Sequence, residues 1–242
     1  MMKRFDTRLV IVSCAALLLA AAATPAAAQV VTRVEPRQAI GLNLGYFAVR
    51  GEDARVDGDV LWEDLSSLAF DVKDFNFATF GGEWLFSLSD YLEAGAGVGY
   101  YQRTVPSVYR SVTHSDGSEI EQDLKLRIVP LTATVRFLPL GRGSIEPYVG
   151  AGIGWFNWRY SETGEFVDFR DDSIFNARFV ANGNSAGPVV LGGIRFPVSD
   201  LWLVGGELRY QKAEGTIDTE GFLGDKIDLG GWTTSFTMHL RF

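Results

Sequence analysis

The chain closes on WTTSFTMHLRF (residues 232–242), in which apolar and polar side chains alternate with a period of two. The apolar face carries Trp232, Thr234, Phe236, Met238, Leu240 and Phe242. Successive side chains of a β-strand point to opposite sides, so this pattern predicts a strand with one apolar and one polar face. Phe242, the last residue, lies on the apolar face, an unusual end for a strand of a soluble sandwich. The stretch therefore predicts the closing strand of a membrane barrel.

The N-terminus has the pattern of a secretory signal peptide over residues 1–28. Lys3 and Arg4 come first, an apolar run follows over residues 9–23, and three alanines precede the expected cleavage point. The run is short for crossing a bilayer, which favours a cleaved signal over an N-terminal membrane anchor. We therefore expect export, and a single domain over residues 29–242.

The composition predicts an acidic protein that is stabilised by its fold alone. Without residues 1–28 the chain keeps 19 of its 22 Lys and Arg residues and 29 of its 30 Asp and Glu residues, a net charge of −10. This acidity argues against nucleic acid as a partner. Cys14 is the only cysteine and would leave with the signal, so no disulfide is expected. No run of about 18 apolar residues follows the signal, so membrane insertion is expected to use strands.

Seven further alternating stretches precede the terminal strand, which makes eight strands in all. The first begins near residue 38. The next five span residues 76–88, 91–103, 124–138, 145–159 and 186–198, and the seventh begins near residue 201. Short turns and long loops alternate between them, so the chain repeats one unit of strand, long loop, strand and short turn. An even number of strands with this alternation is typical of outer-membrane barrels.

The long connections carry three more specific expectations. Residues 104–123 and 160–184 are predicted to be loops. Leu61, Leu65 and Leu68 recur at helical spacing after Asp59, which predicts a short helix covering the barrel mouth. The apolar positions change from even to odd near Pro130, and a β-bulge is expected there because proline lacks an N–H donor.

Aromatic residues on the apolar face fall at two levels, as expected for the two girdles of a membrane barrel. Those next to the short turns or the C-terminus are Phe86, Phe137, Phe196, Trp202 and Phe242. Those next to the long loops are Tyr46, Tyr100, Trp155, Tyr210 and Trp232.

The alternation that ends at Phe242 resembles the C-terminal assembly signal of bacterial outer-membrane β-barrels. The resemblance implies that the barrel assembly machinery reads Trp232, Phe236, Met238, Leu240 and Phe242. The chain after the signal also resembles the small eight-stranded proteins of the OmpX, OmpW and OmpA-barrel type. This implies an all-β, eight-stranded, antiparallel up-and-down transmembrane barrel in the cell outer membrane. The short turns would lie in the periplasm, and the surface would meet outer-membrane lipid and lipopolysaccharide.

The polar faces of the predicted strands place nine titratable side chains inside the barrel. They are Glu83, Glu93, Arg136, Glu146, Arg195, Glu207, Arg209, His239 and Arg241. A charge inside a narrow barrel is costly unless it is paired, and arginine offers a two-pronged fork for carboxylate. These residues therefore predict a salt-bridged plug, with a gated ion path as the alternative. Inward glycines leave room for Phe47, Tyr101, Tyr148 and Phe156.

Two functions remain open: a structural or interaction barrel whose loops contact lipopolysaccharide or external partners, and a narrow OmpW-like channel for small or apolar solutes. Catalysis is not expected, because His114 falls in a loop and His239 is placed inward near the periplasmic end. The sequence contains no His or Cys cluster for a metal and predicts no cofactor. The loop acids could share divalent cations with lipopolysaccharide or form a solvated rim; they are Asp57, Asp59, Asp171 and Asp172.

Overall fold

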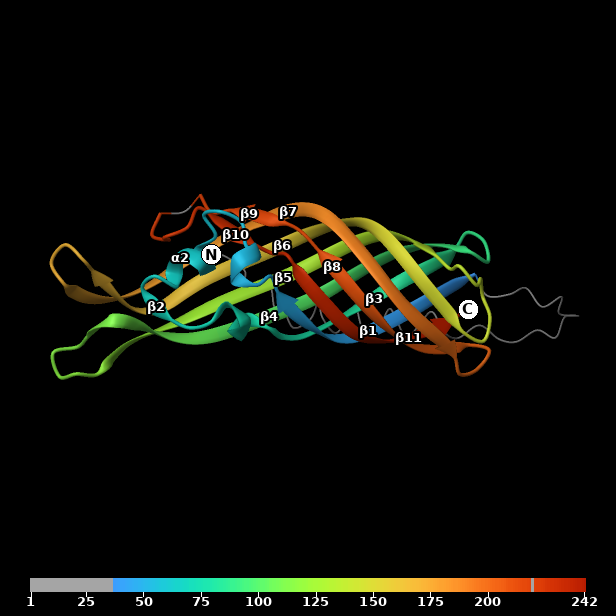
Figure 1. Ribbon diagram of the computed structural model, residues 1–242, viewed down its shortest axis with the longest axis horizontal. Coiled ribbons are helices and arrows are strands. Elements are labelled where there is room, and N and C mark those ends of the chain that lie inside the picture. The colour runs from blue at the N-terminus through green and yellow to red at the C-terminus, as the bar shows by residue number, and fades with distance from the viewer. Residues whose placement is uncertain (1–36, 219) are drawn as a thin grey trace, which may run out of the picture. The chain divides into compact units, whose positions relative to one another are not determined.

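The computed structural model describes residues 37–218 and 220–242, so the predicted signal peptide lies outside the described residues. Eight long strands make up the fold: β1 (Gln38–Val49), β3 (Phe77–Ser87), β4 (Leu92–Thr113), β5 (Glu119–Phe137), β6 (Glu146–Asp168), β7 (Ser173–Pro197), β8 (Trp202–Gln211) and β11 (Gly231–Arg241). Each pairs antiparallel with the next, and β11 pairs with β1, which closes the ring (Figure 1). The predicted up-and-down barrel is confirmed.

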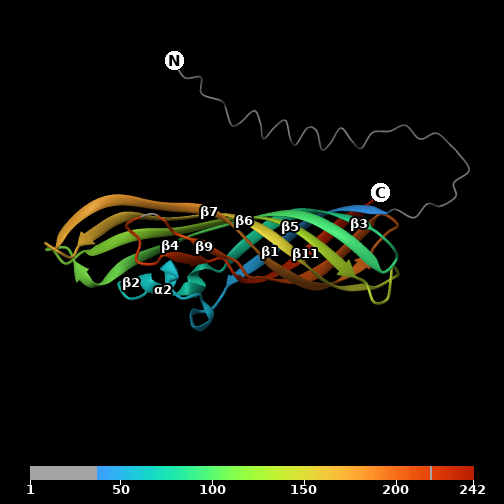
Figure 2. The same cartoon turned by 90° about the horizontal axis from the view of Figure 1, so that it is seen from above.

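Short elements fill the two long connections on one side of the barrel. The first connection holds η1 (Glu52–Ala54), α2 (Val60–Asp64), β2 (Leu68–Ala69) and η2 (Val72–Phe75), and the second holds β9 (Glu214–Thr216) and β10 (Lys226–Asp228). We call residues 50–76 and 212–230 together the cap. In both views α2, β2 and β9 lie beside the far ends of β4 to β7 (Figures 1 and 2). In the described part of the chain, no helix is long and apolar enough to cross a membrane.

The short helix expected after Asp59 is confirmed. The Asp59 carboxylate accepts a hydrogen bond from the N–H of Trp62 at 3.2 Å, which satisfies one of the free donors at the start of α2. Leu61 is fully buried and Leu65 packs against the same core. The helix ends at Asp64, so the third leucine of the pattern, Leu68, lies in β2 instead.

The two predicted loops at residues 104–123 and 160–184 are wrong for most of their length. β4 continues to Thr113 and β5 begins at Glu119, while β6 continues to Asp168 and β7 begins at Ser173. These four strands run far beyond the ends of the others. We call their outlying part, residues 101–113, 119–129, 156–168 and 173–185, the extension. Its residues do not show the apolar outer face that marked the other strands, which is why they resembled loops.

The bulge predicted at Pro130 is also wrong. Val98 pairs with Leu131 and Tyr101 pairs with Ile128, so the register on the two sides of the proline is the same. The two pairs between them are missing because proline has no N–H to donate. The only register shift along this pair of strands in the described residues lies between Val108 and Thr113.

What changes at Pro130 is the chemistry of each face. Below it, on the side of the short turns, Leu131 and Val135 point outward and are about half exposed, at 52% and 50%. Above it, Leu126 and Ile128 point inward and are buried. The side chains keep their directions, but the apolar face passes from the outside of the barrel to the inside. This inversion is expected where a strand leaves lipid and enters water.

The barrel therefore has two stacked compartments. Around the lower one, aromatic and aliphatic side chains lie exposed on the outer face, among them the expected girdle residues Tyr46, Trp155, Trp232, Phe137 and Phe242. Inside the extension the core is apolar instead. It joins Leu61 of α2 and Phe75 of η2 to inward residues of the long strands, including Leu124, Phe156, Trp158 and Tyr160. Full burial of an apolar side chain of this size contributes about 1.5–3 kcal/mol to the free energy of unfolding.

Candidate functional site

Polar side chains fill the lower lumen in two ion-paired clusters, and all nine predicted lumen residues lie in them. Because inward positions recur at every second residue, strands that are not neighbours can meet across the narrow interior. The first cluster contains Glu83, Arg136, Glu207, Arg209 and His239. The second contains Glu93, Glu146, Arg195 and Arg241.

Arg136 is the centre of the first cluster. It is fully buried, and its guanidinium binds both carboxylate oxygens of Glu83 and reaches Glu207 Oε2 at 3.1 Å. Arg209 Nη2 lies 2.8 Å from Glu207 Oε1, and His239 Nε2 lies 2.7 Å from Glu83 Oε1. Two carboxylates therefore share two guanidinium groups and one imidazole.

Arg195 and Arg241 hold the second cluster together. Arg195 Nη2 lies 2.8 Å from Glu93 Oε2 and 3.6 Å from Glu146 Oε2. Arg241 Nη2 donates to both oxygens of Glu146 at 2.7 Å. Glu146 is fully buried, so its charge is tolerated only because both arginines are present.

Tyr148 joins the two clusters, a role that the sequence did not indicate. Its ring lies 5.0 Å from the guanidinium carbon of Arg136 and 4.9 Å from that of Arg195, and its hydroxyl donates to Glu207 Oε2 at 3.0 Å. The ring fits only because Gly193 has no side chain, since a Cβ there would lie 2.5 Å from the Tyr148 hydroxyl. The sequence had indicated only that this tyrosine occupies space beside inward glycines.

Above the ion pairs the interior holds a small cavity and then aromatic rings. A cavity of about 40 Å³, lined in part by Asn43, Glu83 and Arg209, has room for a few water molecules. Phe47 and Tyr101 border the same cavity and meet edge to face, with ring centres 5.0 Å apart. Both belong to the apolar core that fills the extension. Charge pairs thus occupy the lower lumen, and packed rings lie above them.

Asp59 fastens the two halves of the cap to each other. It binds the Arg55 guanidinium through both oxygens, and its Oδ1 accepts the N–H of Asp228 at 2.7 Å. Arg50 Nη1 in turn lies 2.9 Å from Asp228 Oδ2. The expectation that Asp59 belongs to a solvated or cation-binding rim is therefore wrong, because the residue is fully buried and paired with Arg55.

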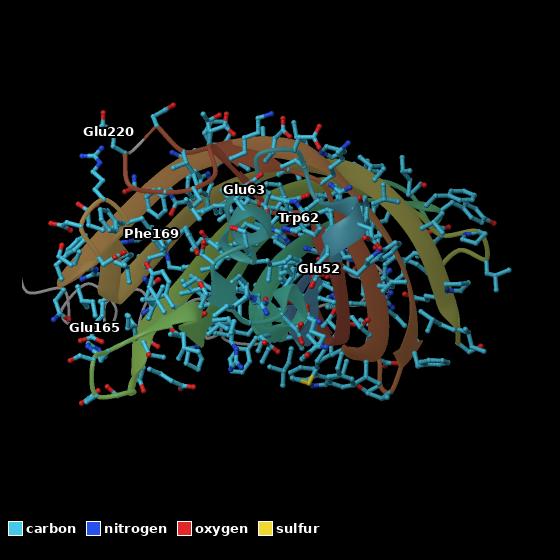
Figure 3. The ribbon with its side chains drawn as sticks, turned by 60° about the vertical axis from the view of Figure 1, so that its left-hand side comes forward. Glu52, Trp62, Glu63, Glu165, Phe169 and Glu220 are labelled. Carbon is cyan, nitrogen blue, oxygen red and sulfur yellow. The ribbon has the colours of Figure 1, made fainter. Side chains whose placement is uncertain are left out.

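The remaining rim acids stay on the surface. Asp57, Asp171 and Asp172 are exposed, and Glu52 and Glu63 lie near the exposed ring of Trp62 (Figure 3). Within residues 37–218 and 220–242, no three His, Cys, Asp or Glu side chains group in a way that could hold a metal ion.

Two carboxyl groups are buried together in the extension. Asp64 at the end of α2 and Glu162 on β6 are 2% and 5% exposed, and the Tyr160 hydroxyl donates to Asp64 Oδ2 at 3.0 Å. Burial raises the pKa of Asp64 to about 7. Burial and the nearby Asp64 carboxylate raise the pKa of Glu162 to about 9. No sequence pattern indicated this pair, because Glu162 fell in a predicted loop.

The two histidines lie far apart in different settings. His114 Nε2 lies 2.9 Å from Glu165 Oε2 near the tip of the extension, and His239 is enclosed in the first ion cluster. Among the described residues, neither ring bonds to a serine hydroxyl, the pairing that an activated nucleophile requires.

The residues of the expected assembly signal follow the predicted faces of β11. Trp232, Phe236, Met238 and Phe242 are exposed on the outside of the barrel at 50%, 58%, 37% and 53%, and Leu240 is half-buried on the same face. His239, one position away, is fully buried inside. The strand pairs with β1 on one side and β8 on the other, so it closes the ring.

A closed antiparallel ring with an apolar outer belt, aromatic side chains at two levels and a polar interior defines an outer-membrane β-barrel. The chain belongs to the family of the outer membrane protein beta-barrel domain, whose family model matches residues 13–239. It is an outer-membrane protein of the Gram-negative type.

Several solved structures of outer-membrane proteins are similar to this chain at low sequence identity. OprG from Pseudomonas aeruginosa is 12% identical with a TM-score of 0.50, over 86% of this chain and 97% of that one. Neisserial surface protein A is 11% identical with a TM-score of 0.48, over 85% and 97% of the two chains. Ail of Yersinia pestis is 11% identical with a TM-score of 0.44, over 86% and 100%. Comparison with curated proteins gives no match.

Proposed function

We propose that this protein is a closed barrel with a structural and interaction role, and that its outer surface contacts lipopolysaccharide or external partners. One observation carries the proposal: in the lower lumen, four glutamates and four arginines are matched to one another. A conducting pore needs charges that face water, whereas these carboxylates are all less than a tenth exposed. Removing one partner of such a buried pair costs about 3–5 kcal/mol, so opening the lumen would be expensive.

The competing function is a narrow channel for small or apolar solutes. It would require the Arg136 and Arg195 pairs to separate and the rings of Phe47 and Tyr101 to move aside. The apolar core of the extension disfavours this, because those rings belong to a core that also includes residues of the cap and of β5, β6 and β7. An experiment that measures ion conduction must therefore distinguish the channel from the closed barrel.

Catalysis is not part of the proposal. An acyl-transfer or hydrolytic site needs a nucleophile and a base within hydrogen-bonding reach of each other. His114 is engaged with Glu165 and His239 with Glu83, and the raised-pKa pair of Asp64 and Glu162 is enclosed in the core. No cofactor enters the proposed role. We further propose that the barrel assembly machinery recognises the outer face of β11 through Phe242 and the apolar residues before it.

Conductance measurements in planar bilayers test the closed barrel. The purified wild-type protein should give no steady single-channel current. The double variant Phe47→Ala/Tyr101→Ala, combined with Arg136→Ala and Arg195→Ala, should give measurable current, because it removes the two rings and the central arginine of each ion cluster. Leu42→Ala/Leu44→Ala changes only the outer face and should stay silent. Steady current from the wild-type protein would overturn the proposal.

A further inference from the structure

The outer surface of the extension carries a cationic patch that the ion pairs of the lumen do not use. Four basic side chains lie on neighbouring strands: Lys125 and Arg127 on β5, Arg159 on β6 and Arg178 on β7. Together with Gln102 and Ser161 they line a hollow of about 120 Å³, and no carboxylate lines it. The chain as a whole has a net charge of −8, so a group of four basic side chains without a carboxylate differs from its acidic composition.

Strand register fixes the height of the patch above the apolar belt. Leu131 and Trp155 are paired neighbours and both are exposed on the outer face. Four residues further along the same strands, Arg127 and Arg159 are paired neighbours. Four residues correspond to about 13 Å along a strand, and to roughly 10 Å of height once the strand tilt is included. The patch therefore lies just above the belt, where the headgroups of the outer leaflet are.

The cations of the patch are not neutralised by carboxylates in residues 37–218 and 220–242. No carboxylate in the described residues forms an ion pair with Lys125, Arg159 or Arg178. Arg127 donates at 3.3 Å to Asn157 Oδ1, and its Nε is buried without a hydrogen-bond acceptor. A buried donor of this kind is costly unless something else supplies the acceptor.

The cap side of the extension differs in charge. Its surface carries Glu52, Glu63 and Glu220, as Figure 3 shows, and the cap packs on the inner side of the long strands. The basic patch is on their outer side, so it is open to molecules that stand beside the barrel in the membrane.

We propose that Lys125, Arg127, Arg159 and Arg178 bind the phosphate groups of a phosphorylated outer-leaflet glycolipid that stands against β5 and β6. This rests on the proposed function and gives its lipid contact a place. The planar guanidinium of arginine can donate to two phosphate oxygens at once, and the ammonium group of lysine adds a positive charge on a flexible side chain. The acyl chains of the same lipid would lie along the apolar belt formed by Leu131, Trp155 and their neighbours. The long side chains can also reach down toward the headgroup.

Lipid binding by protein purified in a nonionic detergent tests this assignment. The probes are bisphosphorylated lipid A and the same lipid after enzymatic removal of its phosphates, and native mass spectrometry measures the bound lipid. The wild-type protein should bind the phosphorylated form at least tenfold more tightly. In Lys125→Gln/Arg127→Gln/Arg159→Gln this affinity should fall about 100-fold, because each cation near a charged lipid surface contributes about a factor of five.

The matched control removes three other basic side chains, in Lys73→Gln/Arg170→Gln/Lys212→Gln, and should bind like the wild type. Both triple variants are first checked for heat-modifiable gel mobility, and the single variant Arg159→Gln replaces the triple if it fails to fold. Equal affinity of wild type and patch variant would overturn the proposal, as would equal affinity for both lipids. Displacement of the lipid by millimolar inorganic phosphate would also overturn it, since it would indicate a site for small anions only. The assay does not depend on the state of the lumen, so a conducting barrel and a failed lipid site give separate results.

Discussion

At the scale of single residues, the centre of the molecule is Arg136. Its guanidinium neutralises Glu83 and Glu207 and lies over the ring of Tyr148. Arg195 lies over the same ring and neutralises Glu93 and Glu146. The net gain from burying such a network is small, because desolvation offsets most of the attraction. The network instead makes the loss of any one member costly.

Arg136→Met tests this cost. It leaves Glu83 and Glu207 in the lumen without their shared cation, so the free energy of unfolding should fall by about 3–5 kcal/mol. Urea titration of the folded barrel in detergent measures it. Arg170→Met, at the exposed turn between β6 and β7, should change the free energy by no more than about 0.5 kcal/mol. Equal effects of the two substitutions would contradict the account of the network.

The pair of Asp64 and Glu162 makes the extension sensitive to pH. Both pKa values are raised in the folded state, from 3.8 to about 7 and from 4.5 to about 9. Folding therefore favours the protonated forms, so the stability they provide is complete below about pH 4 and is lost as pH rises through 7 and 9. The free energy of unfolding should fall across this window.

Asp64→Asn should reduce that fall, because an amide still accepts the Tyr160 hydrogen bond and does not ionise. The variant should be more stable than the wild type by about 1–2 kcal/mol at pH 9 and nearly equal to it at pH 5. Tryptophan fluorescence during urea unfolding at both pH values measures this. Glu119→Gln, which changes an exposed carboxylate at the start of β5, should leave the pH dependence unchanged. Parallel stability curves for Asp64→Asn and wild type would show that the pair does not titrate as described.

At the scale of elements, β11 has two tasks. It closes the ring by pairing with β1 and β8, and its outer face carries the residues proposed as the assembly signal. The two tasks can be separated by position. Phe236 and Phe242 are both about half exposed on this face, at 58% and 53%, but Phe236 lies in the middle of β11 and Phe242 directly after its last residue.

Phe242→Ala should impair assembly more than it lowers the stability of folded protein. Its burial in the interface contributes at most about 2 kcal/mol, which a closed barrel can lose. The amount of protein in the outer membrane, compared with material in the periplasm or degraded, is the readout. Phe236→Ala removes a similar apolar area in the middle of the strand and serves as the control. Wild-type levels of both variants in the outer membrane would refute the assembly role of Phe242.

At the scale of the whole molecule, the barrel is two joined structures with opposite polarity. In the lower part the outside is apolar and the inside is charged, whereas in the extension the inside is apolar and the outside is polar. The same strands pass through both, and the inversion falls where Pro130 and Trp155 mark the upper edge of the belt. The cap completes the extension by covering the inner side of β4 to β7.

A closed barrel of this kind should stay folded in detergent until it is heated. The folded protein should fractionate with the outer membrane and run at a different apparent mass in gels before and after boiling. All ring strands are hydrogen-bonded on both sides over their lower parts, so no open edge offers a start for unfolding there. Recovery as a soluble protein without detergent would contradict the membrane barrel.

The sequence by itself determined the number of strands, their order and the faces of their lower halves. Lipid demands apolar side chains at every second position, so each crossing leaves a pattern that can be read without neighbours. The same alternation identified the nine lumen residues, because a position opposite a lipid-facing one must point inward. The helix after Asp59 was also readable, since capping and leucine spacing are local.

Only the tertiary structure decided where the strands end and which charges meet. The extension has no lipid around it, so Glu162 and Arg178 appear in a stretch that resembles a loop. Glu83 and Glu207 reach Arg136 from strands that are not its neighbours, and Glu93 reaches Arg195 in the same way. Asp64 meets a tyrosine 96 positions away. These contacts depend on barrel stagger and on how the cap folds over the long strands. Both arise from long-range packing, which leaves no periodic signal in the sequence.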